Sequence, residues 1–304
     1  MGIILEKHPS FSAYLSGFEY ISKIDRGVSG DGKHRIRRDG RDFLLRIASG
    51  EKYAQIKQEF DWLKTLSEAG LPVPECVDLT RSRDGARVFT LLSWIPGEDL
   101  EHLLPELSRD RQYACGFQAG EILRRTHEAS DHPVQDWYDR YRTVMEPQLD
   151  AFLREKALFE GSECVLRYLE EHYELLKTRP LCSLHEDYHI GNLILNSGKL
   201  FVIDWHPVYF NNLGDPWYAF HCLRTEYPAF ASGQIDGYFH GAVPEEFWQL
   251  FAFYYSAGIL STIVWLNHAA PGELNQMQEL HRRVLQMFNE MQDPHPMWYG
   301  TPSA

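Results

Sequence analysis

The sequence predicts an α+β protein in two lobes, a small lobe built on an antiparallel sheet and a larger, mainly helical lobe. Residues 1–94 contain short strand-like runs separated by turn residues and one segment with helical spacing. Longer segments with apolar residues at helical spacing follow, and one strand-length hairpin interrupts them at 181–205. With 304 residues the chain has material for two domains, which we expect at 1–94 and 95–304.

The small lobe is expected to begin with strands at 18–24, 34–37 and 43–47. In the third strand, side chains alternate between two faces, so that Leu44 and Arg46 share one face. The opposite, apolar face carries Phe43, Leu45 and Ile47. Ser49 or Gly50 can cap the helix that follows.

That helix has an apolar stripe at helical spacing, formed by Ile56, Phe60, Leu63 and Leu66. Glu59 falls inside the stripe, where a carboxylate is costly unless it is paired. Arg46 is the expected partner. The alternative is that Glu59 lies at the edge of the stripe and reaches water.

A glycine-rich segment separates the first two strands. Its candidate nucleotide-binding residues are Gly27, Ser29, Gly30 and Gly32. The glycines would let backbone amides approach a phosphate closely, and Ser29 could add a hydroxyl donor. The alternative is a hairpin turn that binds nothing.

The segment at 185–192 supports two interpretations. As His-x-Asp-x-x-x-x-Asn it predicts a phosphotransferase loop, in which Asp187 serves the attacking hydroxyl and Asn192, with the later Asp204, binds Mg²⁺. As His-Glu-x-x-His it predicts a zinc-peptidase helix carrying His185 and His189.

The flanking residues favour the phosphotransferase loop. Pro180 and Gly191 leave little room for helical turns, and two apolar runs then surround the turn residues Ser197 and Gly198. A hairpin closing there would bring Asn192 close to Asp204. One register sets them directly opposite, whereas a slip by one residue would send them to opposite faces.

Helices are expected in the larger lobe at 107–128, 137–153 and 164–176, and again from about 215 to 291. Residues 247–270 contain no Asp, Glu, Lys or Arg. Their length would suffice for a bilayer, but polar residues interrupt them and basic flanks are absent, so a core helix is expected and no membrane association.

Charge is divided unevenly along the chain. Residues 1–95 carry a net charge of +2 and residues 96–304 a net charge of −15, in agreement with −13 overall. The slightly positive charge of residues 1–95 suits nucleotide phosphates. The negative charge of residues 96–304 would attract a cationic substrate or would simply keep the protein soluble. The acidity argues against nucleic acid as a partner.

Five scattered Cys and no signal-peptide pattern predict a cytoplasmic protein.

Together these motifs resemble the aminoglycoside phosphotransferase family, relatives of protein kinases and choline kinases. The resemblance covers nearly the whole chain. It includes the glycine-rich loop, Arg46, Glu59, Gly70 to Pro74 and the helical Leu123 to His127, and it ends with the catalytic loop and Leu213 to Trp217. It implies a bilobal protein-kinase-like fold with an interlobe hinge at 91–97.

The resemblance also implies roles for individual residues. Asp187 would orient or deprotonate the substrate hydroxyl, and Arg46 would contact the α- and β-phosphates of ATP or GTP. The backbone of Ser93, Trp94 and Ile95 would meet the purine. His185 and Asp215 would brace the catalytic loop.

The chain departs from the family pattern at four positions. Glu186 and His206 stand where the pattern has Gly, Arg46 stands where many members have Lys, and Ala219 lies where an acidic residue is common. Arg is always charged and binds phosphate in a fork, so phosphate binding is still expected at residue 46. The last departure leaves the substrate open.

The sequence therefore predicts an ATP- or GTP-dependent, Mg²⁺-dependent kinase of a small-molecule hydroxyl. The leading substrate is an aminoglycoside-like cation, as in antibiotic-resistance kinases. The alternatives are a zinc metallopeptidase and a kinase-shaped binding protein without catalysis. No sequence feature specifies an oligomeric state.

Overall fold

The computed structural model describes residues 14–25, 30–129, 136–154, 160–205, 212–269 and 274–300. The chain forms two compact units. The first comprises Met1–Leu100 with Leu193–His206, and the second comprises Glu101–Asn192 with Pro207–Ala304. The hairpin that follows residues 185–192 thus packs with the N-terminal unit. The domain limits expected at residues 94 and 95 stay a prediction.

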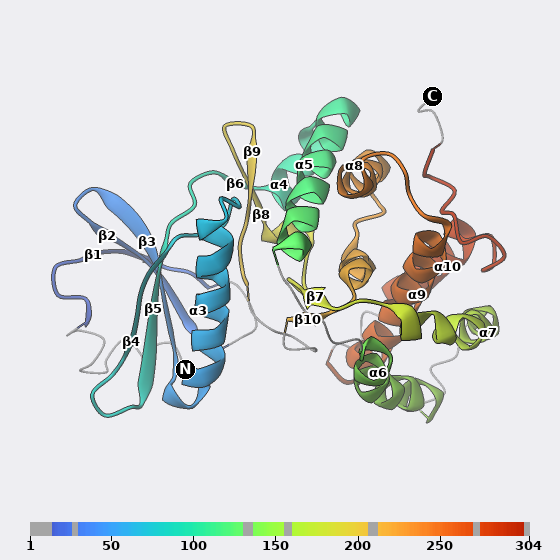
Figure 1. Ribbon diagram of the computed structural model, residues 1–304, viewed down its shortest axis with the longest axis horizontal. Coiled ribbons are helices and arrows are strands. Elements are labelled where there is room, and N and C mark those ends of the chain that lie inside the picture. The colour runs from blue at the N-terminus through green and yellow to red at the C-terminus, as the bar shows by residue number, and fades with distance from the viewer. Residues whose placement is uncertain are drawn as a thin grey trace. The chain divides into compact units, whose positions relative to one another are not determined.

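The first unit contains a five-stranded antiparallel sheet in the order β1-β2-β3-β5-β4 (Figure 1). Its strands are β1 (Glu19–Lys23), β2 (Gly32–Arg38), β3 (Arg41–Ser49), β4 (Cys76–Arg81) and β5 (Arg87–Ser93). The three predicted strands are present. The second begins two residues earlier than expected, because Gly32 pairs with Ile47 of β3 and so belongs to the ladder instead of the loop.

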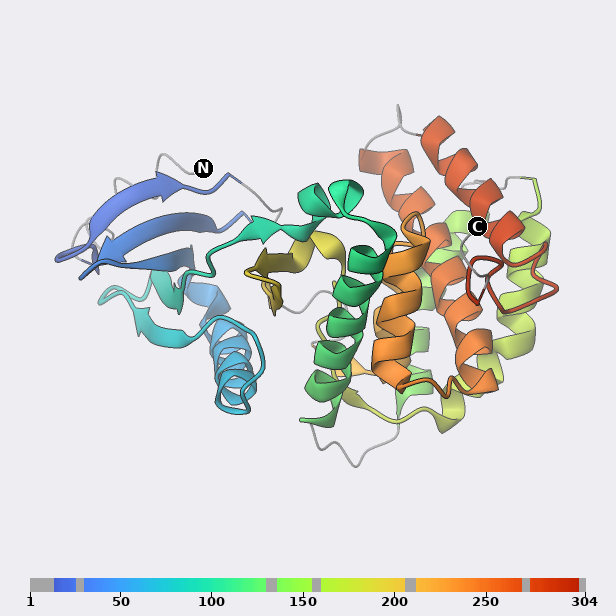
Figure 2. The same cartoon turned by 90° about the horizontal axis from the view of Figure 1, so that it is seen from above.

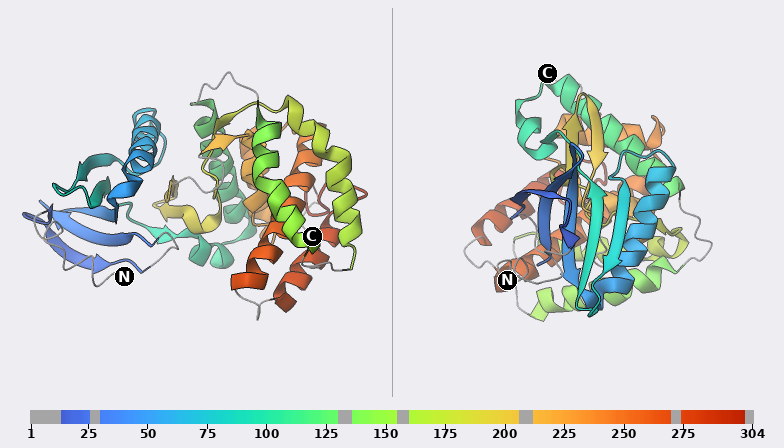
Figure 3. Two further views of the ribbon diagram at one scale, coloured as in Figure 1. Left: turned by 90° about the horizontal axis from the view of Figure 1, so that it is seen from below. Right: turned by 90° about the vertical axis from the view of Figure 1, so that its left-hand side faces the viewer.

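The two faces of this sheet pack against different residues. The predicted apolar face of β3 joins a buried cluster of Ile36, Phe43, Leu45, Ile47, Phe89 and Leu91. On the other face, Ala48 and Val88 pack against Ile56 of α3 (Tyr53–Glu68), which lies along the sheet (Figure 3). Ser49 caps the short 3-10 helix Gly50–Lys52 that leads into α3. The helix therefore covers the face to which Arg46 belongs.

A smaller sheet completes the first unit, in the order β6-β8-β9. Its strands are β6 (Glu98–Asp99), β8 (Leu193–Asn196) and β9 (Lys199–Val202). Ser197 and Gly198 join β8 to β9 with φ of 49° and 82°, the left-handed conformations of a type I′ turn. The predicted hairpin is confirmed. At Gly97 a Cβ would lie 2.6 Å from the Leu195 carbonyl oxygen, so this crossing requires glycine.

The second unit is mainly helical (Figure 2). Its helices are α4 (Leu100–Leu103), α5 (Arg109–Glu128), α6 (Trp137–Arg154), α7 (Ser162–His172), α8 (Pro228–Phe239), α9 (Glu245–Ala269) and α10 (Leu274–Met287). Two short strands, β7 (Cys182–Ser183) and β10 (Leu213–Gly214), pair antiparallel. The 3-10 helices of this unit are Leu104–Glu106, Tyr173–Thr178, Ile190–Asn192 and Pro216–Cys222. The helices expected from sequence are all present within a few residues of their predicted limits.

Glycines let α5 and α8 lie side by side (Figure 2). A Cβ at Gly116 or Gly120 of α5 would lie 2.0 or 2.1 Å from a backbone oxygen of α8. A Cβ at Gly233 or Gly237 of α8 would lie 2.2 or 2.1 Å from a backbone oxygen of α5. Because such distances are far inside van der Waals contact, the two backbones can approach this closely only without side chains here.

The uncharged segment forms most of α9, which begins at Glu245 and packs against α6, α7 and α10. Its residues Phe247, Leu250, Phe251 and Tyr254 are at most 1% exposed. Within the described part of the chain, every helix is too short or too polar to span a bilayer. The expected core helix is confirmed for this segment.

Candidate active site

Residues 185–189 form a loop. They follow β7 and lead into the 3-10 helix Ile190–Asn192. Glu186 has a left-handed φ of 61°, which is incompatible with an α-helix through the segment. The zinc-peptidase helix is therefore wrong, because His185 and His189 do not project from one helical face. Among the described residues, no three His, Cys, Asp or Glu side chains are grouped as metal ligands.

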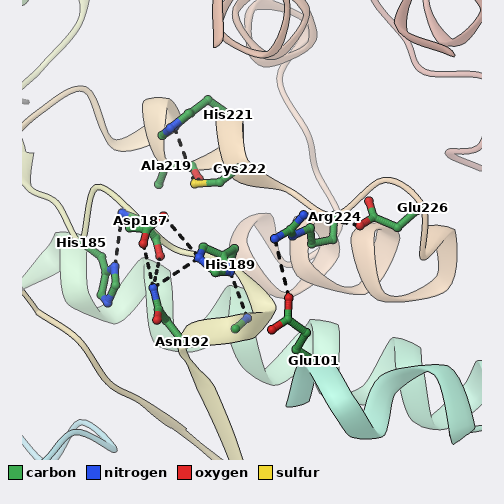
Figure 4. Close-up of polar contacts among 11 residues, drawn as sticks. Glu101, His185, Asp187, His189, Asn192, Ala219, His221, Cys222, Arg224 and Glu226 are labelled. Carbon is green, nitrogen blue, oxygen red and sulfur yellow. Dashed lines mark hydrogen bonds and ion pairs between the residues drawn. The ribbon is translucent and has the colours of Figure 1, made fainter. Parts of the chain in front are cut away.

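Asp187 lies at the centre of the polar contacts of this loop (Figure 4). Asn192 Nδ2 donates to the Asp187 carbonyl oxygen at 2.9 Å and to Oδ2 at 3.0 Å, and His189 Nε2 lies 3.4 Å from Oδ1. Burial raises the pKa of Asp187, but contacts with His189, His185 and Asn192 outweigh burial and lower the pKa to about 2. Asp187 is therefore an ionised carboxylate at neutral pH, well suited to orient a hydroxyl.

The backbone of the loop sets the tautomer of His189. The Gly191 N–H donates to His189 Nδ1 at 3.0 Å, so this nitrogen acts as the acceptor. In the neutral ring the proton must then reside on Nε2, the nitrogen that faces Asp187. His189 thus presents a donor to the carboxylate.

The same reasoning orients the amide of Asn192. Both of its hydrogen bonds to Asp187 use Nδ2, which directs Oδ1 away from that carboxylate and makes it suitable as a metal ligand. The β8–β9 ladder ends at the pair Leu193 and Val202. Asn192 precedes it in a 3-10 turn, and Asp204 follows it with a φ of 64°. Strand alternation therefore does not determine the directions of these two side chains.

Asp204 contacts a lysine within the first unit. Lys33 Nζ of β2 lies 3.4 Å from Asp204 Oδ1, and the two side chains are 13% and 24% exposed. Lys33 pairs across the sheet with Arg46 of β3, so both cations lie on one face. Lys33 is not among the residues that the sequence predicts to contact nucleotide or metal.

The predicted pairing of Arg46 with Glu59 is present. Arg46 Nη1 donates to Glu59 Oε1, and both side chains are about nine-tenths buried. Arg46 Nη2 also lies 3.6 Å from Asp31, whose other oxygen accepts from Lys52 Nζ at 2.8 Å. Burial lowers the pKa of Arg46, but Glu59, Asp204 and Asp31 outweigh it, and the net shift is upward. Arg46 is therefore a charged, firmly held cation.

Of the other residues predicted to contact the nucleotide, only some lie in the described part of the chain. Gly27 and Ser29 lie outside the described residues. Gly30 has a φ of 71°, which favours glycine. In the hinge, the Ser93 N–H donates to the Glu75 carbonyl oxygen and the Trp94 N–H to that of Asp42. A purine contact there would consequently fall to Ile95 N–H and to carbonyl groups.

Glu186 has a local role that the sequence did not reveal. Its Oε1 accepts the backbone N–H of Asn212, while the Asn212 side chain donates to the Leu184 carbonyl oxygen at 2.8 Å. The Leu184 N–H in turn donates to the Asn212 carbonyl oxygen at 2.8 Å. These bonds tie the loop at 185–189 to the segment just before β10. The carboxylate at this position acts as a clamp, which a glycine could not supply.

Asp215 is fully buried and holds a separate network. It accepts from Arg179 Nε at 2.9 Å and Nη2 at 3.1 Å, from the Trp217 N–H at 3.0 Å and from the Tyr254 hydroxyl at 2.6 Å. The support that Asp215 is predicted to give to residues 185–189 would be indirect. Asp215 directly follows β10, and β10 pairs with β7, the strand that leads into that loop. His185 contacts the loop directly by accepting the Asp187 N–H at 3.3 Å.

An ion-pair group lies close to the loop in the second unit (Figure 4). Arg224 lies 3.9 Å from Glu101 and 3.7 Å from Glu226. A Cβ added at Gly191 would lie 3.3 Å from Glu101 Oε2, which shows how near this carboxylate is to the loop. Ala219 is buried in the adjoining 3-10 helix and adds no charge. Two carboxylates and one guanidinium give this group a net negative charge.

The sequence profile of the phosphotransferase enzyme family matches residues 21–249. The chain belongs to this family. A curated relative, mouse acyl-CoA dehydrogenase family member 10, is 27% identical over 197 residues. That match spans 57% of this chain and only 17% of the mouse protein.

Several solved structures share the fold of this chain. A thermostable mutant of aminoglycoside phosphotransferase APH(4)-Ia, in complex with ADP and hygromycin B, matches with a TM-score of 0.64 at 15% identity, covering 94% of this chain and 97% of its own. A choline/ethanolamine kinase family protein from Mesorhizobium loti gives 0.59 at 16% identity, with 96% of each chain covered. Spectinomycin phosphotransferase APH(9)-Ia, in complex with ADP and spectinomycin, gives 0.57 at 15% identity, covering 92% and 91%.

These comparisons confirm the predicted family and the kinase-like fold class, with its small antiparallel-sheet part and helical remainder. Family and fold together support a small-molecule kinase.

Proposed function

We propose that this phosphotransferase transfers the γ-phosphoryl group of ATP or GTP to a hydroxyl of a small molecule, with Mg²⁺ as cofactor. The observation that carries the proposal is the contact between Asn192 and Asp187. The amide nitrogen faces the carboxylate, which directs the amide oxygen elsewhere as a hard ligand. Oxygen donors from Asn192 and Asp204 fit Mg²⁺, which would neutralise charge on the transferred phosphoryl group.

In this proposal Asp187 accepts a hydrogen bond from the acceptor hydroxyl and aims its oxygen at the γ-phosphorus. The new P–O bond forms as the bond to the β–γ bridging oxygen breaks, and the hydroxyl proton passes to Asp187. Because its pKa is about 2, Asp187 takes the proton only after bond formation has made the hydroxyl acidic. His189 holds the carboxylate in place during transfer. Ile95 would serve the purine, and Gly30 the phosphates.

An aminoglycoside-like cation is the proposed substrate, as in an antibiotic-resistance kinase of the cytoplasm. Support comes from the net charge of −15 in residues 96–304 and from the carboxylates of Glu101 and Glu226 near the catalytic loop. Acidic groups around a site raise the local concentration of a cation.

The test is a nucleotide-consumption screen with ATP and GTP against aminoglycosides, other sugars and amino alcohols, with and without EDTA. We expect turnover with a hydroxylated, amine-bearing compound, loss of turnover in EDTA, and a phosphate ester in the product by ³¹P NMR. Asp187→Asn should abolish turnover and leave nucleotide binding intact. Nucleotide binding without turnover on the whole panel would instead favour a kinase-shaped binding protein.

A further inference from the structure

The cations on the α3-facing side of the sheet are not equivalent. Arg46 is held by Glu59 and Asp31, so two carboxylates share one guanidinium. Lys33 lies beside it on the neighbouring strand and approaches Asp204 at 3.4 Å. The first contact is a nine-tenths-buried hydrogen bond, whereas the second is a 3.4 Å ion pair at the end of a flexible four-carbon stem.

Their different surroundings give the two cations different freedom. Removing Arg46 from Glu59 would leave a buried carboxylate without its main counter-charge, which is strongly unfavourable in proteins. Lys33 can swing away at much smaller cost, because Asp204 is 24% exposed and can be solvated. Of the two, Lys33 is therefore the cation that can follow a ligand.

The position of Lys33 should depend on whether Mg²⁺ and the nucleotide are bound. Its ammonium group lies 3.4 Å from the Asp204 carboxylate, so a divalent cation bound to that carboxylate would repel it. Phosphate oxygens on the same face of the sheet would attract it. Both effects move Lys33 in the same direction.

We infer that Lys33 is the mobile phosphate-binding cation of this site and the resting counter-ion of Asp204, whereas Arg46 is mainly an anchor for Glu59. The inference rests on the proposed use of Mg²⁺ and nucleotide. When nucleotide and metal bind, Lys33 leaves the Asp204 carboxylate and contacts phosphate oxygens. Until then, Lys33 neutralises the charge of Asp204.

The experiment measures two binding constants in Lys33→Met and in the matched control Lys52→Met. Lys52 pairs with Asp31, the other carboxylate beside Arg46, and is 42% exposed. Calorimetry would give ATP affinity in EDTA and Mg²⁺ affinity without nucleotide. For Lys33→Met we expect ATP to bind about tenfold more weakly. Mg²⁺ should bind about threefold more tightly, because its competitor is gone.

Opposite shifts in the two affinities separate a positioning role from a structural one, since misfolding would weaken both. Lys33→Arg should restore most of the ATP affinity. Equal affinities in Lys33→Met and Lys52→Met, or a loss of both affinities, would overturn the inference. Failure of the wild-type protein to bind ATP or Mg²⁺ would count against the proposed function itself.

Discussion

The side-chain nitrogen of Asn192 lies 3.0 Å from Oδ2 of Asp187, and this contact determines which end of the amide remains for a metal. A carboxamide offers one donor group and one acceptor oxygen. With the donor committed to Asp187, the oxygen is the end that can bind a cation.

Asn192→Leu should therefore remove the proposed metal ligand and a support of Asp187 together. We expect kcat to fall at least about a hundredfold, with no recovery at high Mg²⁺, as when a preorganised catalytic contact is lost. Asn196→Leu, at the other end of β8, is the control and should retain normal kcat. Steady-state kinetics across a Mg²⁺ series measures both. Full rescue by Mg²⁺ would show that only metal affinity had changed.

Breaking the buried ion pair should cost stability as well as activity. Arg46→Met leaves Glu59, 9% exposed, without its principal counter-charge, and we expect a loss of about 3–5 kcal/mol. The double variant Arg46→Met with Glu59→Leu should recover most of that stability, because the unpaired Glu59 charge is gone and Asp31 keeps its pair with Lys52. Chemical denaturation of both variants is the measurement. A double variant as unstable as the single one would show that the pair does not act as a unit.

The clamp from Glu186 to Asn212 predicts a graded effect on catalysis. Glu186→Gln keeps an acceptor oxygen for the Asn212 N–H and should leave kcat within about twofold of normal. Glu186→Ala removes the acceptor and should lower kcat about tenfold with little change in the nucleotide KM. Kinetics of the two variants, side by side, distinguish the hydrogen bond from the charge. Equal losses in both would assign the effect to the negative charge.

Alanine at the α5–α8 crossing should destabilise the second unit. In Gly120→Ala the new methyl group would lie 2.1 Å from the Gln234 carbonyl oxygen, and we expect about 2–4 kcal/mol of lost stability. Gly258→Ala in α9 is the control, because its Cβ would lie 3.8 Å from the nearest atom outside its own helix, on His221. That change should be neutral or stabilising by up to about 1 kcal/mol. Thermal unfolding of both variants tests the contrast.

Acid sensitivity should come in part from His127. Burial lowers its pKa to about 3, whereas an unfolded histidine titrates near 6.5. The unfolded chain therefore binds the extra proton first, so this contribution to stability is full above pH 6.5 and declines as the pH falls below it. At pH 5 the loss is about 2 kcal/mol.

His127→Gln should flatten the dependence of Tm on pH between 6.5 and 4. Gln can still reach toward the Tyr238 hydroxyl, which lies 3.0 Å from His127 Nδ1. The same substitution at exposed His102 controls for the loss of an imidazole. An unchanged pH slope in His127→Gln would show that this histidine does not control acid unfolding.

Much of the fold could be predicted because its signals are local. The alternation in β3, the apolar stripe of α3 and the turn at Ser197 and Gly198 each depend on neighbours in the chain, and all three are present. The pairing of Arg46 with Glu59 was also predictable, since a carboxylate within an apolar stripe requires a partner.

Local sequence patterns were also sufficient to recognise the family motif and to name the residues of a phosphotransferase loop. Only tertiary structure decided what those residues touch: that Gly191 sets the tautomer of His189, that Glu186 reaches Asn212, and that Lys33 meets Asp204 across 171 positions of sequence. The physical reason is that periodicity fixes which face of an element a side chain occupies, whereas hydrogen bonds between distant segments depend on how those faces pack. At both ends of the hairpin that carries Asn192 and Asp204, the chain leaves strand geometry, so alternation carries no further information there.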